Sequence, residues 1–285
     1  MTRSALLQRI ALYAFLLTAA AIFGLPLYVM VATSLKSMPE LRETGIFALP
    51  RALDPSAWRM AWTGACTGLT CGGISPGFWN SVKIVVPSVG LTVLAGALNG
   101  YAMTFWKPPL SGLLLGLMVL GAFLPHQIFL YPLVQWLSAI GIYQTLPAII
   151  VIHCIFGIPL MTLLFRGYYS GLPRQLFLAA QIDGAGFWRI FLCIMLPLAA
   201  PVTVVAVILQ STAIWNDFLL GLVFAGRENL PMTVQLNNIV NTVTGERDYT
   251  VDMAATVLTA LVPLAIFLLS GRWFVRGITA GAVKG

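Results

Sequence analysis

The amino-acid sequence predicts an all-α membrane protein, and three observations support this fold class. Of the 285 residues, 59% are hydrophobic and only 9% are charged, whereas about 25% of the residues in soluble globular domains are charged. Six apolar segments each reach roughly 18 residues or more, long enough for a helix to cross a bilayer. None of the segments alternates as a barrel strand does, so their backbone groups must be paired within helices. We therefore expect a single transmembrane domain over residues 1–285.

The expected membrane spans follow one another along almost the whole chain. They lie near residues 10–34, 80–105, 111–136, 144–166, 193–220 and 253–275. The first span follows Arg3 and Arg9, as the apolar core of a signal peptide would. Its apolar stretch continues to Val31, which is longer than such a core, so we predict a helix that is not cleaved.

The distribution of charge predicts the orientation of these spans. If both termini are inside, the inner segments carry nine basic residues and one acidic residue, Asp183, whereas the charges of the outer segments balance. Cytoplasmic segments are enriched in Lys and Arg, so both termini are expected in the cytoplasm. The sequence contains no basic run, and we expect no nucleic-acid partner despite the net charge of +7.

Two outer loops are long, residues 35–79 and 221–252, and loops of this length usually carry a function. The first loop contains Cys66 and Cys71 in Cys-Thr-Gly-Leu-Thr-Cys. On the predicted topology this loop faces an oxidising compartment, so we predict a disulfide between them. The alternative is a pair of free thiols.

The inner segment 167–192 contains a short predicted helix. A break at Gly171-Leu172-Pro173 precedes it, and Gly184 follows Asp183 at its end. Three- and four-residue spacing places four residues on one face: Leu176, Ala179, Ala180 and Asp183. The two alanines would let another surface approach closely, so this helix is predicted to dock a partner. The alternative is an amphipathic helix on the membrane surface, which Trp188 and Arg189 would suit.

The spacing in and after this helix resembles the permease signature of ATP-binding-cassette importers. Ala179-Ala180 is followed by Gly184 after three residues, then by Ile194 and Leu196-Pro197. Further matches resemble the sugar-import branch that includes the maltose permeases, namely Trp215-Asn216-Asp217-Phe218, Pro125, Pro132, Arg276-Gly277 and residues 281–285. The first outer loop, with its cysteines and Gly77-Phe78-Trp79-Asn80-Ser81, is similar to glucose- or mannose-type members.

The resemblance implies a type I permease bundle of six helices with a cytoplasmic coupling helix. Such a subunit lies in the bacterial inner membrane, surrounded by lipid, and forms the sugar path with a second homologous permease. Its other partners are two copies of a cytoplasmic ATPase and an extracytoplasmic sugar-binding protein. This chain would not be an enzyme and would hold no cofactor, because ATP and Mg²⁺ would bind the ATPases. The sequence accordingly has no phosphate-binding Gly-x-x-x-x-Gly-Lys motif.

Coupling to the ATPase is assigned by the same resemblance to residues in and after the short helix: Leu178, Ala179, Ala180, Asp183, Gly184 and Phe187. The family usually has Glu at the position of Leu178, where it anchors a basic residue of the ATPase. An apolar anchor is therefore predicted here in place of an ionic one.

Candidate residues for the substrate path lie in the third and fifth spans. Asp217 is an intramembrane carboxylate, and such groups usually face a cavity or a partner. Together with Trp215, Asn216 and Gln127 it could bind sugar hydroxyls and stack on a sugar ring. The alternative is a helix end at the membrane interface, where Trp is common.

Other site chemistries have less support in the sequence. His126 and His153 are the only histidines, and without a metal-binding pattern we expect core histidines and no metal site. An ion-coupled secondary carrier is the alternative function, but it needs ionisable residues within the spans, and only Asp217 clearly qualifies.

Overall fold

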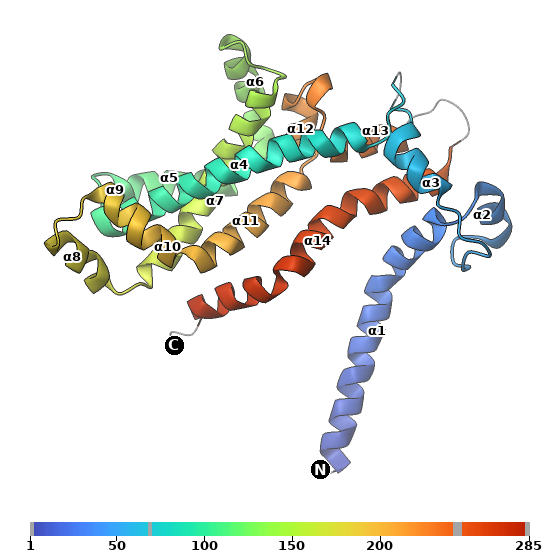
Figure 1. Ribbon diagram of the computed structural model, residues 1–285, viewed down its shortest axis with the longest axis horizontal. Coiled ribbons are helices and arrows are strands. Elements are labelled where there is room, and N and C mark those ends of the chain that lie inside the picture. The colour runs from blue at the N-terminus through green and yellow to red at the C-terminus, as the bar shows by residue number, and fades with distance from the viewer. Residues whose placement is uncertain (1–2, 68–69, 242–246, 283–285) are drawn as a thin grey trace. The chain divides into compact units, whose positions relative to one another are not determined.

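The computed structural model describes residues 3–67, 70–241 and 247–282, and their regular structure is helical (Figure 1). The only β-type pairing among them is an isolated bridge between Cys66 and Cys71. Where the sequence predicts a single domain, contacts divide the chain into two compact units. Unit 1 comprises residues 1–76 and 235–261, and unit 2 comprises residues 77–234 and 262–285.

The helical elements follow one another along the chain, with α-helices named α and with π- or 3₁₀-helical turns named η. The first half contains α1 (Arg3–Ser34), α2 (Met38–Thr44), α3 (Ser56–Arg59), η1 (Met60–Gly64), α4 (Ser75–Tyr101), η2 (Ala102–Trp106), α5 (Ser111–Phe123), η3 (His126–Phe129) and α6 (Leu130–Ala139). The second half contains α7 (Leu146–Ser170), α8 (Arg174–Ile182), α9 (Phe187–Ile190), η4 (Phe191–Met195), α10 (Leu196–Leu198), α11 (Ala200–Trp215), α12 (Leu219–Phe224), η5 (Arg227–Asn229), α13 (Met232–Val240) and α14 (Tyr249–Ala282).

Four of the described helical segments are long and apolar enough to cross a membrane as they stand: Leu7–Ser34, Ser75–Trp106, Leu146–Ser170 and Tyr249–Ser270. Two further pairs reach this length only together. Ser111–Phe123 and His126–Ala139 meet at 103°, and Phe187–Leu198 and Ala200–Trp215 meet at 77°. Counting each bent pair as one span gives six, the number that the sequence predicts.

The third and fifth spans therefore differ from the continuous helices that the sequence predicts. Pro125 has no N–H group, and the residue before a proline is driven out of the helical region. Leu124 accordingly takes an extended conformation with ψ of 138°, and the chain bends there. The fifth span bends at Ala199 and ends at Trp215, so that Asp217 lies beyond the helix.

In unit 1 the helix α2 is held at both ends by side chains. The Ser37 hydroxyl accepts from the Glu40 N–H at 3.4 Å at the N-terminus. At the C-terminus, Lys36 Nζ donates to the Gly45 carbonyl at 2.8 Å, and only 1% of Lys36 is exposed. A cation at this end complements the helix dipole. Part of the predicted outer loop 35–79 thus forms the helix α2.

Cys66 and Cys71 are joined by a disulfide in the structure. The ring that they close follows η1, and the Gly73 N–H donates to the Ala65 carbonyl at 2.8 Å. Gly73 has a φ of +62°, and a Cβ there would collide with the Trp62 backbone. Glycine is therefore required where the chain leaves the ring.

We expect the same disulfide in protein isolated from cells, because on the predicted topology this loop faces an oxidising compartment. Mass spectrometry of protein alkylated before and after reduction would detect it. The cysteine pair should resist alkylation until it is reduced, whereas Cys193, which is exposed in this chain, serves as the reactive control. Full alkylation of Cys66 and Cys71 without reduction would contradict this expectation.

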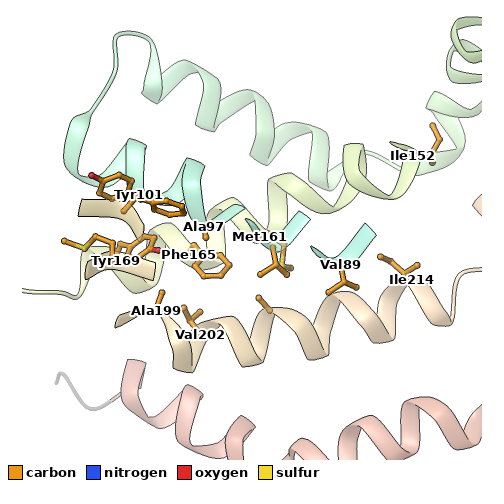
Figure 2. Close-up of a cluster of buried hydrophobic side chains, with 14 of the residues drawn as sticks. Val89, Ala97, Tyr101, Ile152, Met161, Phe165, Tyr169, Ala199, Val202 and Ile214 are labelled. Atoms are coloured by element: carbon orange, nitrogen blue, oxygen red, sulfur yellow. The ribbon is translucent and has the colours of Figure 1, made fainter. Parts of the chain in front are cut away.

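The core of unit 2 is formed where α4, α7 and α11 pack together (Figure 2). Figure 2 shows Val89, Ala97 and Tyr101 from α4, Ile152, Met161, Phe165 and Tyr169 from α7, and Val202 and Ile214 from α11. The approach of α4 to α7 depends on Gly96 and Gly100. A Cβ on Gly100 would lie 2.7 Å from the Arg166 backbone nitrogen, and one on Gly96 would lie 2.8 Å from the Met161 carbonyl carbon. This Gly-x-x-x-Gly pair brings two backbones into contact, as is common between membrane helices.

Candidate functional site

The short helix α8 ends in a left-handed glycine, as the sequence predicts. Gly184 has a φ of +76°, which glycine adopts without a steric penalty. The last carbonyls of the helix are satisfied by N–H groups just beyond it. Asp183 N donates to Ala179 O at 3.0 Å, and Ala185 N donates to Ala180 O at 2.9 Å. The cap fixes where α8 stops and where the chain turns toward α9.

The inward face of α8 rests on a cluster of aromatic side chains. Phe177 is 3% exposed and stacks on Phe105 with ring centroids 4.9 Å apart. Trp106 Nε1 donates to the Tyr101 hydroxyl at 2.6 Å, and that hydroxyl donates to the Phe187 carbonyl at 3.1 Å. We call these five residues the aromatic base. It ties α8 and α9 to the end of α4 and to η2.

The outward face of α8 carries two exposed aliphatic side chains one helical turn apart. Leu178 is 43% exposed and Ile182 is 86% exposed. Ala179, Asp183 and Gly184 are exposed as well. This face is small and presents two aliphatic side chains, and the aromatic base supports the helix on its opposite side. The face can therefore enter a cleft in a partner protein.

The outward face of α8 differs from the predicted coupling set at three positions. Ala180 is only 6% exposed and belongs to the inward face. Phe187 is part of the aromatic base, with its ring centroid 4.9 Å from that of Tyr101. Ile182, which is absent from the predicted set, is the most exposed aliphatic residue of the helix. The spacing of four residues from Leu178 is the signal that could have identified it.

A second candidate site is a cavity of about 390 Å³ inside unit 2. Its wall combines residues of α5, η3, α6, α7, α11 and α12 and is mostly apolar. Four polar side chains also line it: His126, His153, Gln210 and Asp217. They come from segments up to about ninety residues apart, and the bend between α5 and η3 brings His126 to the cavity.

The Asp217 carboxylate is fixed in place by the start of α12. One oxygen, Oδ1, accepts from the Leu220 N–H at 3.2 Å, and Oδ2 accepts from the Gly221 N–H at 2.8 Å. The His153 Nε2 atom lies 4.0 Å from Oδ2, which is too far for a direct hydrogen bond. The Asp217 side chain is 17% exposed and the His153 side chain 7%.

Gln210 and Gly157 face each other across the α7–α11 contact. Gln210 is 5% exposed. A Cβ on Gly157 would collide with Gln210 Nε2, so the glycine makes the space in which the amide lies. Two rings also meet at the cavity, those of His126 and Phe156, whose centroids are 4.3 Å apart.

Of the four residues predicted to line a substrate path, the structure places only Asp217 in this cavity. Trp215 is 3% exposed and packs edge-on against Phe78 at 5.7 Å, so its indole is not available for stacking on a sugar. Asn216 and Gln127 are exposed outside the cavity. Of the two histidines predicted as core residues, His153 is buried and His126 is exposed. Both line the cavity, and so does Gln210, which the sequence pattern did not single out. Gln210 lies in α11 and Asp217 lies beyond the end of that helix, so no helical spacing in the sequence connected the two.

Comparison with known proteins identifies similar chains. Residues 89–281 match the family model described as binding-protein-dependent transport system inner membrane component. A probable ABC transporter permease protein of Pyrococcus horikoshii is 42% identical over 60% of this chain and 62% of its own length. An alpha-glucoside transport system permease protein of Rhizobium meliloti is 35% identical over 76% of this chain and 58% of its own. This chain thus spans less than two thirds of either relative.

A longer match is to an osmoprotective compounds uptake permease protein of Synechocystis, 30% identical over 97% of this chain and 93% of the relative. Among solved structures, a chain of a bacterial ABC transporter involved in the import of the acidic polysaccharide alginate has a similar fold. Its TM-score is 0.80 at 16% identity, covering 95% of this chain and 98% of that chain.

Proposed function

This chain belongs to the family of binding-protein-dependent transport system inner membrane components, and from that premise we propose that it is a permease subunit of an ATP-driven sugar importer. The observation that carries the proposal is the outward face of α8, which presents Leu178 and Ile182 above a buried aromatic base. The substrate class rests on the alpha-glucoside permease among the relatives.

In this proposal the chain is one subunit of a larger complex. A second, homologous permease completes the path, two copies of a cytoplasmic ATPase bind ATP and Mg²⁺, and an extracytoplasmic binding protein delivers the sugar. Both chain termini lie in the cytoplasm, on the side of α8, and the disulfide ring lies outside. The chain itself catalyses no reaction.

Movement of the ATPases would be transmitted through α8. Because Phe177 stacks on Phe105 and Tyr101 binds the Phe187 carbonyl, a push on α8 displaces the ends of α4 and α9 together. From α9 the chain continues through η4 and the 77° bend into α11, which carries Gln210 and leads to Asp217. The fold thus supplies a continuous mechanical connection from the docking face to the cavity.

An ion-coupled carrier remains the second candidate function, because the cavity brings His126, His153 and Asp217 together. The two functions differ in their energy source. Proteoliposomes containing the purified complex should accumulate labelled methyl α-D-glucoside only when ATP is supplied on the α8 side. Uptake that is driven by a proton or sodium gradient without ATP, and that stops with an ionophore, would favour the carrier.

Leu178→Asp and Ile182→Asp should each weaken retention of the ATPase on the purified permease pair by about tenfold or more. Burial of an aliphatic side chain of this size contributes roughly 1.5–3 kcal/mol, whereas an exposed ion pair contributes at most about 1 kcal/mol. Leu178→Met is the matched control and should behave as the wild type. The measurement is ATPase co-purification at low and high salt. If high salt dissociates the ATPase from the wild type, or if both Asp variants retain it, charged contacts hold α8 to the ATPase instead.

A further inference from the structure

We propose that the cavity lined by His153, Gln210 and Asp217 is a binding subsite for a single sugar ring within this subunit. The inference rests on the proposed import of sugars and specifies where in this chain the substrate is held. The volume of about 390 Å³ falls within the roughly 300–1,000 Å³ of small-molecule sites.

The Gln210 amide is open to the cavity. The residue is 95% buried and lines the cavity, and the structure contains no hydrogen bond between its amide and any described residue. Its amide atoms are not among the described polar atoms that are sealed off without a partner, so a ligand in the cavity can reach them. An amide is both a donor and an acceptor, and a sugar hydroxyl also donates and accepts. Gly157 leaves the space in which the amide lies, because a Cβ there would collide with Gln210 Nε2.

His153 and Asp217 can share one hydroxyl group. Their nearest atoms, Nε2 and Oδ2, are 4.0 Å apart, too far for a direct hydrogen bond and too close for an oxygen to lie on the line that joins them. A hydroxyl oxygen beside that line, about 2.8 Å from each atom, can accept from the imidazole N–H and donate to the carboxylate. The carboxylate is already held by the Leu220 and Gly221 N–H groups, so it is positioned before the ligand arrives.

Apolar side chains form much of the remaining cavity wall. Phe156, Phe129 and Leu160 all line the cavity, and the Phe156 and Phe129 ring centroids are 6.1 Å apart. A sugar ring has hydroxyl groups at its edge and C–H groups on its faces, so it matches a cavity that combines a few polar groups with apolar and aromatic side chains. A lipid chain would fill the volume but leave Gln210 without a partner. A metal ion lacks ligands, since no three His, Cys, Asp or Glu residues are grouped among the described residues.

The test uses the assembled complex in nanodiscs without the binding protein, with tritiated methyl α-D-glucoside as the probe. Gln210→Met keeps the side-chain length and removes the amide, and it should raise the Kd by about fivefold or more, as expected for the loss of a buried hydrogen bond. The matched control is Gln8→Met, the same change at an exposed residue of α1 outside the cavity, which should leave the Kd unchanged. If Gln210→Met fails to assemble, His153→Phe is the second variant, because it keeps a ring and removes both nitrogens. It should weaken binding to a similar extent.

Failure of this inference is distinguishable from failure of the proposed function. If ATP-driven uptake of the sugar is normal but the assembled cavity variants bind the probe as the wild type does, the subsite is wrong and the importer stands. If the wild-type complex neither binds nor imports the sugar, the proposed function itself is wrong. A lipid or detergent chain that native mass spectrometry finds in both wild type and Gln210→Met would also overturn the subsite.

Discussion

Gly100→Leu is expected to abolish most of the folded protein in the membrane. A Cβ at this position would lie 2.7 Å from the Arg166 backbone nitrogen and 3.0 Å from the Phe165 carbonyl carbon. These neighbours are backbone atoms and cannot rotate away, so α4 and α7 would have to separate along the core that they share with α11. Overpacking of side chains alone costs about 1–3 kcal/mol, and displacement of a helix should cost more. Gly96→Leu is expected to act in the same way, because its Cβ would meet Met161.

The matched control is Gly90→Leu on the same helix, where a Cβ has no neighbour within 4 Å. It makes the same change in helix propensity and hydrophobicity. Yield of monodisperse protein in size-exclusion chromatography and the midpoint of thermal unfolding would report the difference. Equal yields and midpoints for Gly100→Leu and Gly90→Leu would mean that α4 and α7 do not pack in this way.

Phe177→Ala is expected to reduce sugar-stimulated ATP hydrolysis by about tenfold or more while the membrane spans remain assembled. Removal of a buried phenylalanine costs about 3–5 kcal/mol of stability. Here the lost contact is one that holds the helix α8, which has only 9 residues. Without the stack on Phe105, α8 keeps Leu178 and Ile182 on its outward face but loses its fixed position above α4. The ATPases would then move α8 without moving the spans.

Trp188→Ala is the control for this variant, since it also deletes an aromatic ring next to α8, but the ring is 60% exposed. The measurements are ATPase activity with and without the binding protein and sugar, and thermal stability of the membrane pair. Stimulation that survives Phe177→Ala would show that the other residues of the aromatic base hold α8 by themselves.

The length of the apolar runs predicted six spans, because each span must satisfy its backbone internally. The structure gives that number when each bent pair of helices counts as one span. The bends were not predictable from the same information. Pro26, Pro87, Pro159 and Pro263 lie within continuous helices, whereas the chain bends at Pro125. Whether a proline kinks or breaks a membrane helix depends on the neighbouring helices. These neighbours cannot be identified from the residues around the proline.

The two candidate sites were predictable to different degrees. The ends of α8 depend on residues close by in the sequence, so Pro173 and Gly184 predicted them. Which residues the outward face presents could not be predicted in the same way. The cavity depends on which side of α7 faces α11. His153 is a polar residue on the cavity side, but a single histidine in a mostly apolar span does not show which helix it faces. His153 and Asp217 therefore looked unrelated, although their nearest atoms are 4.0 Å apart.

The bend after Phe123 has a consequence for the lipid around the protein. A helix of 13 residues such as α5 rises only about 20 Å, which is short of the roughly 30 Å hydrocarbon core. The backbone groups that the bend releases cannot face acyl chains. They must therefore face protein or a water-filled cavity, and Gly121, Ala122 and His126, on the two sides of the bend, do line the cavity of unit 2. The bend thus limits which side of this span can be turned toward lipid.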